Sequence, residues 1–297
     1  MSRLLVSNHD HVPVHRPDPH PLRGRSVPVR QGLIPAAGSG SRLGPFTNAI
    51  PKELLPVGEK AVIEHVVEAM SLAGITDIVI VVSPHKHGLS DYLGSGKRFG
   101  VDFTYVVQDE RIGLANAVAA GEHVIDGTFA VVLGDNFFAP QTFLADLIGY
   151  HAARRPETTV GVARVEDVTR HGIILPDGDR VADMVEKPQP TAAPSNLGAL
   201  GAYVFETTIF DAIARTPPGH KGEYQLTDAI RLEIGEGRDV RYRVIDGIHI
   251  DVGTPRDLMR ANEWYLRENE CAESDHTITT GRDETFGLVT RGPGSRT

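Results

Sequence analysis

A glycine-rich stretch that follows a short apolar run is the first candidate for chemistry in this sequence. The segment reads PAAGSGSRLGPFTNAIPKELLPV over residues 35–57. Gly38 and Gly40 permit positive φ angles, so backbone N–H groups can approach an anion, and Arg42 adds a forked donor that suits phosphate. The stretch therefore predicts a phosphate site, and a plain glycine-rich turn is the alternative.

Two well-known phosphate motifs do not fit this spacing. A dinucleotide fingerprint needs G-x-G-x-x-G opening directly into a helix, whereas the third glycine here is Gly44, and Pro45 and Pro51 follow it. The P-loop pattern G-x-x-x-x-G-K-[ST] is absent from the sequence. Lys52 lies on the same irregular stretch as Arg42, so the two cations could grip successive phosphates of a triphosphate. A surface lysine is the ordinary interpretation of a lone Lys.

Carboxylates accompany two apolar runs later in the chain. Asp135 stands in VVLGDNFF and Asp251 in HIDVGTP. The carboxyl end of a parallel strand is where α/β proteins bind ligands, and aspartate oxygens suit Mg²⁺. The two aspartates are therefore predicted to share one Mg²⁺ that straddles the phosphates of a substrate. A turn-forming Asp-Asn pair is the alternative for Asp135.

Another charged pair ends a β-rich stretch in MVEKPQP. Glu186 and Lys187 are adjacent, so on a regular strand their side chains point to opposite faces unless the strand bends. A solvated charge pair is the alternative to a substrate-binding role.

Apolar runs that alternate with helical patterns must position these residues. Runs that begin near residues 32, 78, 103 and 129 predict buried parallel strands. A 3.6-residue period over 62–73, ended by Gly74, predicts a helix between the first two runs. Further helices are expected over 115–124 and 143–152. This rhythm is typical of an α/β sheet.

The second half of the chain is richer in β-strand patterns. PDGD between two such stretches is a hairpin signal. A final helix is expected from Pro255, with Thr254 as its N-cap. The predicted architecture is an α/β nucleotide-binding core with a mixed, substrate-facing second half.

Composition bounds the class of protein and its partners. The chain has 297 residues, of which 40% are hydrophobic, and its formal net charge is −9. This charge argues against broad binding of nucleic acid or anionic membranes, which needs clustered Lys and Arg. Cys271 is the only cysteine, which excludes an intramolecular disulfide and a cysteine-based zinc site. Since no apolar stretch approaches 18 residues, we expect a cytoplasmic protein without membrane or nucleic-acid partners.

The two ends of the chain differ from its body. Residues 1–30 carry four histidines among prolines and arginines without a period, which predicts a disordered leader; prolines interrupt the ligand spacing of the alternative, a metal site. Residues 271–297 are polar and contain glycines, which predicts a tail or loose cap. One folded domain is therefore expected over 31–270.

The motifs in their order along the chain resemble a known family. G-x-G-S-R, P-K-E-L-L-P-V, L-G-D-N, V-E-K-P and D-V-G-T are similar to the sugar-1-phosphate nucleotidyltransferases, and most similar to their glucose-1-phosphate thymidylyltransferase branch. AIPKELLPV is just as similar to the UTP-using glucose-1-phosphate enzymes. The resemblance spans roughly residues 31–265. It implies a Rossmann-like mixed sheet flanked by helices, with a smaller β-rich portion that binds the sugar.

This resemblance implies a reaction and its partners. A nucleotidyl group would pass from dTTP or UTP to glucose 1-phosphate, with Mg²⁺ as cofactor and pyrophosphate as the released product. The protein would be a homo-oligomer, either a dimer or a tetramer. No nucleophilic side chain is needed, because the attacking phosphate, with a second pKa of about 6, is largely ionised at neutral pH. Positioning and charge neutralisation suffice.

The resemblance also implies roles for individual residues. Arg42 would stabilise the departing pyrophosphate, and Lys52 would bridge the α-phosphate and the incoming phosphate. Gln108 would read the base edge, since its amide matches the O4 and N3–H edge of uracil or thymine. The remaining implied contacts are Asp135 and Asp251 with Mg²⁺; Ala37, Gly38, Ser39, Gly40, Ser41 and Gly113 with the nucleotide; and Gly172, Glu186, Lys187, His171, Leu200 and His249 with the sugar phosphate.

Three of these positions depart from the thymidylyltransferase pattern. His171, Leu200 and His249 stand where tyrosine, threonine and tryptophan are usual. Drift at a pocket rim is one explanation. The other is an acceptor that differs from glucose 1-phosphate, such as a modified sugar, a cyclitol or another phosphate, because imidazoles change both shape and hydrogen bonding.

Two other classes of function compete with this hypothesis. A regulatory homologue that senses NTP or sugar nucleotide without turnover would need broken catalytic positions, and the implied ones are intact. An NAD-dependent oxidoreductase is disfavoured by the glycine spacing.

Overall fold

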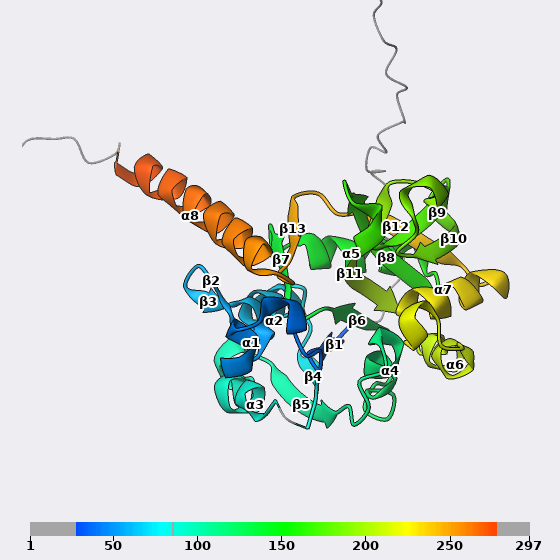
Figure 1. Cartoon of the computed structure of the whole chain (residues 1–297), viewed down its shortest axis with the longest axis horizontal. Coiled ribbons are helices and arrows are strands. Elements are labelled where there is room, and N and C mark those ends of the chain that lie inside the picture. Colours follow the sequence, from blue (N-terminus) through cyan, green and yellow to red (C-terminus); the bar gives the residue numbers. More distant parts are fainter. Residues whose placement is uncertain (1–27, 85, 278–297) are drawn as a thin grey trace, which may run out of the picture.

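A nine-stranded mixed sheet forms the centre of the molecule (Figure 1). The computed structural model describes residues 28–84 and 86–277. The strands of this sheet are β1 (Gln31–Pro35), β4 (Asp77–Val82), β5 (Asp102–Val107), β6 (Phe129–Val132), β8 (Thr158–Arg164), β9 (Gly172–Asp177), β10 (Arg180–Glu186), β11 (Leu197–Phe205) and β12 (Val240–Val244). Their spatial order is β5-β4-β1-β6-β11-β8-β12-β10-β9. Two short ribbons accompany the sheet, β2 (Pro56–Val57) with β3 (Lys60–Ala61), and β7 (Asn136–Ala139) with β13 (Ile248–Asp251).

Helices cover both faces of the sheet and enclose two hydrophobic cores. The helices are α1 (Phe46–Ala49), α2 (Val62–Leu72), α3 (His87–Leu93), α4 (Leu114–Ala119), α5 (Phe143–Arg154), α6 (Thr208–Arg215), α7 (Leu226–Gly235) and α8 (Pro255–Thr277). One core contains buried side chains of α2 and α5, such as Met70 and Leu147. The other contains those of α4, α6 and α7, such as Val118, Ile209 and Ile230. The predicted α/β fold is confirmed.

The four apolar runs of the first half form adjacent parallel strands, as predicted. β1 pairs in parallel with β4 and with β6, and β4 pairs in parallel with β5. Leu33 of β1, which is fully buried, lies opposite both Val79 and Val131. Because parallel strands place their carboxyl ends at one edge of the sheet, the segments that follow all four strands meet there.

The β-rich second half extends the same sheet. β11 pairs antiparallel with β6 and so joins the two halves. The hairpin predicted at PDGD is confirmed, because β9 and β10 pair antiparallel and are connected through Gly178, which has a φ of +61°. A left-handed conformation of this kind is the one that glycine adopts without steric cost.

Most predicted helices are confirmed, but two of their ends differ. α2 is followed by Gly74 with a φ of +86°, and Thr254 caps α8, since its Oγ1 accepts a hydrogen bond from the Asp257 N–H at 3.2 Å. α4 is shorter than the helix expected over 115–124. It ends at Ala119, before Gly121, where an added Cβ would lie 2.4 Å from the side chain of Leu33.

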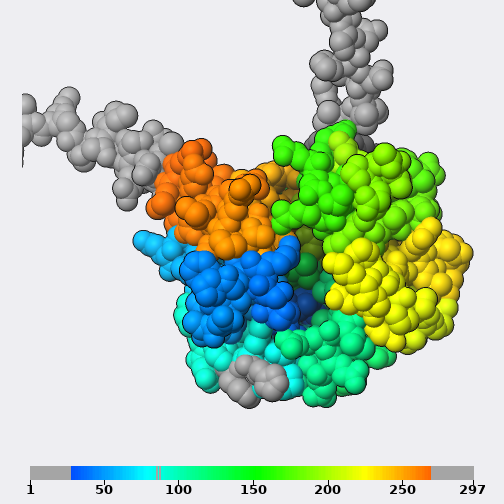
Figure 2. Space-filling model, viewed as in Figure 1, coloured from blue at the N-terminus to red at the C-terminus, as the bar shows by residue number. Residues whose placement is uncertain are grey.

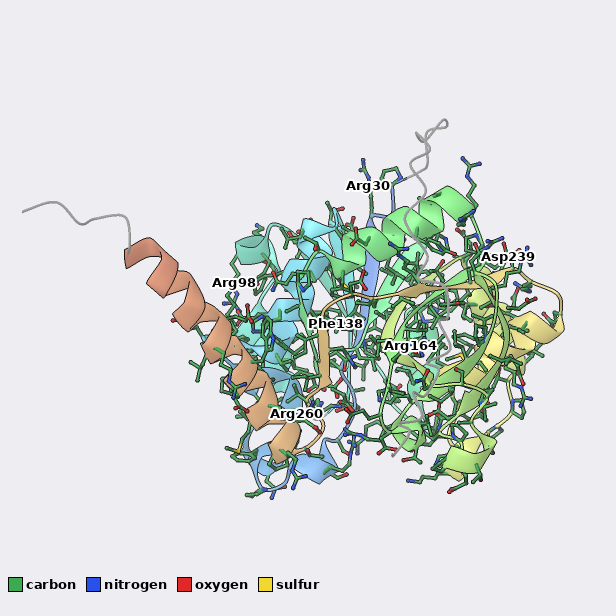
Figure 3. All side chains as sticks on the ribbon, turned by 90° about the horizontal axis from the view of Figure 1, so that it is seen from above. Arg30, Arg98, Phe138, Arg164, Asp239 and Arg260 are labelled. Carbon is green, nitrogen blue, oxygen red and sulfur yellow. The ribbon has the colours of Figure 1, made fainter. Side chains whose placement is uncertain are left out.

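The last helix extends further than the sequence indicated. α8 continues to Thr277, past the domain boundary expected at residue 270, while residues 278–297 and the predicted leader up to residue 27 lie outside the described residues. Its first turns pack on the β7–β13 ribbon, where Ala261 joins a small core with Ile250 and Phe137. Figures 1 and 3 show its far end projecting from the body. Among the described residues, none of the helices combines the length and apolar character that a membrane crossing requires.

The buried imidazole of His65 makes the stability of this fold sensitive to acid. Its Nε2 lies 2.9 Å from the carbonyl oxygen of Val57, and its ring meets that of Phe137 edge-on. Burial lowers the pKa of His65 in the folded protein. The unfolded chain therefore binds more protons as the pH falls below about 6.5, which lowers the free energy of unfolding by up to about 1.4 kcal/mol per pH unit.

We predict that His65→Gln, whose amide can still donate to Val57, flattens this acid dependence. Urea unfolding of both proteins between pH 7.5 and 5.5 measures it. Parallel curves of unfolding free energy against pH would show that His65 contributes nothing to the acid limb.

Candidate active site

The glycine loop and Asp135 adjoin because they follow neighbouring parallel strands. The loop begins directly after β1, and Asp135 comes three residues after the end of β6. The Gly134 N–H lies 3.3 Å from the carbonyl oxygen of Pro35, which ties the two segments together. Gly40 has a φ of +66°, and an added Cβ there would lie 2.8 Å from Thr47, so this position needs glycine.

Lys52 closes the site from the short 3₁₀ helix η2 (Lys52–Leu54). Its Nζ forms an ion pair with Oδ2 of Asp135. An added Cβ on Gly38 would lie 3.4 Å from the same Nζ, which places the ammonium group against the glycine loop. Burial disfavours the charged lysine, but Asp135 and Glu53 outweigh it and raise the pKa of Lys52. Burial likewise opposes ionisation of Asp135, and Lys52 reverses this and lowers its pKa.

Asp251 reaches the same place along the β7–β13 ribbon. It lies opposite Asn136, and the N–H of Val252 donates to the carbonyl oxygen of Asp135 at 3.0 Å. Burial and the neighbouring Asp135 carboxylate raise the pKa of Asp251 to about 6. The structure therefore brings the two predicted metal-binding aspartates together.

Two arginines approach Asp251 at distances too long for direct hydrogen bonds. Nη2 of Arg42 lies 4.0 Å from Oδ2 of Asp251, and Nη2 of Arg170 lies 3.7 Å from the same oxygen. Arg170 also pairs with Asp257 of α8 at 3.2 Å. Arg170 precedes His171 in the sequence but belongs to none of the motifs given above, and only its position next to Asp251 identifies it as a site residue.

A buried ion pair supports the glycine loop and Lys52 from behind. Both carboxylate oxygens of Glu53, whose side chain is 1% exposed, accept from Nζ of Lys86 at 2.8 and 2.7 Å. The same ammonium donates to the carbonyl oxygen of Ala36 at 2.9 Å, at the start of the loop. Burial raises the pKa of Glu53 and lowers that of Lys86, which reflects the cost of desolvating both charges. Sequence reasoning missed this pair, although Glu53 stands next to Lys52.

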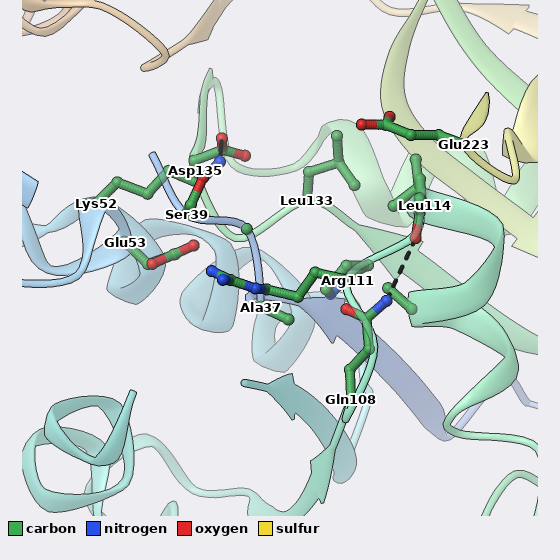
Figure 4. A pocket seen from close by; sticks show the side chains of 14 residues that line it. Ala37, Ser39, Lys52, Glu53, Gln108, Arg111, Leu114, Leu133, Asp135 and Glu223 are labelled. Atoms are coloured by element: carbon green, nitrogen blue, oxygen red, sulfur yellow. Dashed lines mark hydrogen bonds and ion pairs between the residues drawn. The ribbon is translucent and has the colours of Figure 1, made fainter. Parts of the chain in front are cut away.

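These segments surround a pocket of about 500 Å³. Figure 2 shows the surface hollowed between the blue N-terminal part and the yellow region of α6 and α7. Of the nucleotide-site and catalytic residues expected from the sequence, the pocket is lined by Ala37, Gly38, Ser39, Lys52, Gln108, Gly113 and Asp135. Arg42 and Asp251 adjoin it through the contacts given above, and Gly40 adjoins Lys52, since an added Cβ there would lie 3.3 Å from the lysine side chain. Ser41 is not among the residues that line the pocket. Sequence reasoning missed the polar lining residues Glu53, Arg111 and Glu223, whose side chains Figure 4 shows around the pocket.

Gly113 connects the base side of the pocket to the second half of the chain. Its φ is +129°, and an added Cβ would lie 2.3 Å from the carbonyl oxygen of Tyr224, so no larger residue fits. The N–H of Tyr224 donates to the carbonyl oxygen of Ile112 at 2.7 Å. This hydrogen bond holds the neighbouring Glu223 at the wall of the pocket. GEYQLTDAI was the signal in the sequence that could have identified it.

The residues expected to bind the sugar phosphate form a second cluster. Lys187 has a φ of +43°, so the chain bends after β10, and its Nζ pairs with Oε1 of Glu186 at 2.6 Å. Oγ1 of Thr227 donates to Oε2 of Glu186 at 2.6 Å. Gly172 lies opposite Glu186, and an added Cβ there would lie 2.7 Å from Oγ1 of Thr227. The bend places Glu186 and Lys187 in direct contact, instead of on opposite faces.

His171, Leu200 and His249, the three positions that depart from the thymidylyltransferase pattern, connect the residues around Asp135 with those around Glu186. The N–H of Lys187 donates to the carbonyl oxygen of His171 at 3.0 Å. Leu200 is buried, and its carbonyl oxygen accepts from Nδ2 of Asn136 at 2.7 Å. Nδ1 of His171 donates to the carbonyl oxygen of Ala199 at 3.2 Å. His249 packs on Phe138, with the ring centroids 4.7 Å apart.

His249 carries a polar atom without a partner. Its Nε2 is buried, and within the described part of the chain no group hydrogen-bonds to it. Burial, and then the proximity of His171, lower the pKa of His249 to about 3, so the ring is neutral.

Oxygen ligands in this arrangement suit a divalent cation. Asp135 and Asp251 offer only carboxylate oxygens, and Mg²⁺ in phosphate-handling sites is commonly held by one or two carboxylates together with substrate phosphates. Burial, and then the nearby carboxylate of Asp135, raise the pKa of Asp251 to about 6, so a cation between the two carboxylates would relieve their repulsion. In the described ranges, 28–84 and 86–277, no group of three or more His, Cys, Asp or Glu side chains could hold a metal by itself. The residues therefore fit an ion that substrate phosphates help to bind.

A glycine loop and a lysine–aspartate pair at the carboxyl ends of the parallel strands are typical of α/β enzymes that act on nucleotides. Comparison with known proteins makes this specific. Residues 31–268 match the Nucleotidyl transferase family, and the chain belongs to it. The family resemblance inferred from the sequence is thus confirmed, as is its enzyme class.

Relatives of known name lie on both expected branches. UTP–glucose-1-phosphate uridylyltransferase YngB of Bacillus subtilis is 36% identical over 233 residues, which cover 68% of this chain and 78% of that protein. A glucose-1-phosphate thymidylyltransferase of Streptomyces antibioticus is 33% identical over 259 residues, covering 85% and 72%. A structure of UDP-glucose pyrophosphorylase complexed with UDP-glucose aligns with a TM-score of 0.75 at 31% identity, covering 81% of this chain and 99% of that one.

Proposed function

We propose that this protein transfers a nucleotidyl group from dTTP or UTP to a sugar 1-phosphate, most simply glucose 1-phosphate, forming an NDP-sugar and pyrophosphate. The observation that carries the proposal is the Lys52–Asp135 pair at the junction of the glycine loop and the β7–β13 ribbon. Relatives named for both nucleotides support the reaction class, and their names divide between the two bases.

In this reaction an oxygen of the acceptor phosphate attacks the α-phosphorus of the NTP. The bond from the α-phosphorus to the bridging oxygen breaks, and pyrophosphate leaves with the electron pair. The acceptor phosphate is already largely ionised, because its second pKa is about 6, so no protein base has to remove a proton. Lys52, which stays charged, would neutralise the α-phosphate and the incoming phosphate, and Arg42 would stabilise the departing pyrophosphate.

The remaining residues would position the substrates. Glu186 would accept hydrogen bonds from hydroxyl groups of the acceptor, and Lys187 would contact its phosphate. Both could bind the same acceptor because the bend at Lys187 brings the two side chains together. Ser39 and the backbone of the glycine loop would hold the triphosphate, and Gln108 and Gly113 would contact the base.

Asp135 and Asp251 would hold Mg²⁺, which on binding would draw the triphosphate oxygens into place and neutralise charge. We predict that dialysis against EDTA abolishes turnover and that added Mg²⁺ restores it. Pyrophosphate release before dialysis, after it and after Mg²⁺ addition measures this. Full activity in excess chelator would remove the metal from the proposal.

A second acceptor class is favoured by one observation. The Nε2 of His249 is buried and without a partner in the described residues. His249 lies near His171, and both are positions that depart from the thymidylyltransferase pattern. An acceptor with an additional polar group, such as a modified sugar or a cyclitol phosphate, would satisfy this ring nitrogen if the His249 ring turned to expose it.

The decisive experiment combines purified full-length protein with ATP, GTP, CTP, UTP or dTTP and a panel of phosphorylated sugars and cyclitols in Mg²⁺. Pyrophosphate release and mass spectrometry of the products identify the productive pairs. Asp135→Asn is the matched control, because it keeps the side-chain shape but removes the charge. Nucleotide binding without pyrophosphate from any pair would favour the sensor hypothesis instead. We further propose that the enzyme acts in the cytoplasm, in keeping with its single cysteine, and that it forms a homo-oligomer as the family resemblance implies.

A further inference from the structure

The side-chain amide of Gln108 has a defined orientation in the pocket. Its Nε2 lies 2.5 Å from Oδ1 of Asn116 and 3.4 Å from the carbonyl oxygen of Gly113. A backbone carbonyl can only accept a hydrogen bond, so the end of the amide that faces Gly113 must be the nitrogen. Figure 4 shows the consequence: the oxygen of Gln108 points away from this contact and toward Arg111.

Asn116 contributes more to this orientation than Gly113 does. The carbonyl oxygen of Gly113 already accepts from the Ala117 N–H at 3.2 Å, in the first turn of α4, and its contact with Gln108 is long. The contact with Asn116 is short and joins two side chains. The backbone of Gln108 is itself fixed, because its N–H donates to the carbonyl oxygen of Val82 at 2.8 Å. The direction of the amide therefore depends on the acceptor oxygen of Asn116.

We propose that Asn116 is a positioning residue that selects the nucleobase through Gln108. The inference rests on the proposed function, in which Gln108 contacts the base. With its nitrogen held by Asn116, Gln108 presents a carbonyl oxygen, which requires a hydrogen-bond donor on the base. Uracil and thymine carry an N–H at N3, whereas cytosine carries a bare ring nitrogen there and its only donor on this edge is the amine at C4. An oxygen of Gln108 that faces N3 is therefore matched by uracil and thymine and repelled by cytosine. Among pyrimidine nucleotides the site therefore accepts UTP and dTTP and rejects CTP.

Replacing Asn116 tests this mechanism. Asn116→Leu removes the short contact at similar volume and leaves only the long 3.4 Å contact with Gly113 to hold the nitrogen, so the Gln108 amide can rotate more readily and present its nitrogen. We expect the ratio of kcat/KM for UTP or dTTP to that for CTP to fall about ten-fold or more, the range expected when one polar contact is exchanged for an unmatched one. Asn116→Asp keeps an acceptor oxygen and should retain the ratio of the unmodified protein. A purely structural role would lower all three rates together and leave the ratio unchanged, which would overturn the proposal.

Equilibrium titrations separate this inference from the proposed function. Binding of UTP, dTTP and CTP to the full chain is measured by calorimetry in the unmodified protein and in both variants, with thermal unfolding as a check on folding. If the preference for UTP and dTTP over CTP falls in Asn116→Leu and persists in Asn116→Asp, the inference stands even if no acceptor yields pyrophosphate. If turnover occurs but Asn116→Leu retains the preference in both assays, the inference is wrong and the proposed function stands. Should Asn116→Leu fail to fold, Asn116→Ser, which is smaller and can turn its hydroxyl away from Gln108, replaces it with the same two outcomes.

Discussion

Lys52→Met is expected to lower kcat by about 1,000-fold, the size of effect seen when one preorganised group that stabilises transition-state charge is removed. Methionine, like lysine, is unbranched and of similar length, so the lower kcat would reflect the loss of the positive charge. Lys52, whose side chain is 17% exposed, is the cation that contacts both the glycine loop and Asp135. Without it, the charge that develops on the transferring phosphoryl group has no ammonium beside it. Steady-state release of pyrophosphate measures the loss.

A second lysine provides the matched control for this experiment. Lys60 pairs with Glu68 at 2.6 Å, but its side chain is 41% exposed and does not line the pocket. Lys60→Met should therefore leave kcat within about two-fold, since surface substitutions away from special features change little. Nucleotide binding and urea unfolding of Lys52→Met distinguish lost chemistry from lost folding. A folded Lys52→Met protein that binds NTP and keeps a tenth of the activity would contradict the role given to Lys52.

Breaking the buried pair of Glu53 and Lys86 is expected to cause the largest loss of stability. Removing one partner leaves the other charge buried without compensation, which costs about 3–5 kcal/mol. Glu53→Met and Lys86→Met should each lower the free energy of unfolding by this amount, as measured by urea denaturation. Activity should fall as well, because Lys86 also holds the carbonyl oxygen of Ala36 at the start of the glycine loop.

The double variant separates the cost of leaving one charge unpaired from the loss of the hydrogen bond between Lys86 and Ala36. Glu53→Met with Lys86→Met removes both desolvated charges, so most of the stability should return, while the hydrogen bond to Ala36 stays lost and activity stays low. The exposed pair of Lys60 and Glu68 is the control, where removal of one partner should cost no more than about 1 kcal/mol. If both single Met variants at the buried pair were as stable as those at the exposed pair, burial would not be what makes the Glu53–Lys86 interaction important.

Elements with a local signature were predictable from the sequence. The parallel strands have continuous apolar runs, and α2 and α8 have their periods and caps, because the interactions that form them lie within a few residues. α4 was predicted too long. It ends at Ala119, and Gly121 just beyond it packs so closely on Leu33 that an added Cβ would lie 2.4 Å from that side chain, a contact between residues 88 positions apart that no local pattern contains.

The same division holds for the site. The glycine loop, Lys52 and Asp135 were predictable because each carries a motif of its own. The order of the strands in the sheet brings these residues together. Lys52 and Asp135, which form an ion pair, are 83 residues apart in the chain. Arg111 and Glu223 reach the pocket from loops without a phosphate motif, and were missed for that reason.

The sequence by itself determined the family, the α/β class and the residue types that can handle phosphate, because these depend on local patterns and on the order of motifs. The tertiary structure decided which charges meet. It placed Lys86 behind Glu53 and Arg170 beside Asp251, and turned the amide of Gln108 toward Asn116. Such contacts join segments far apart in the chain or depend on one rotamer, so they are fixed only when the strands pack and bring their carboxyl ends to one edge.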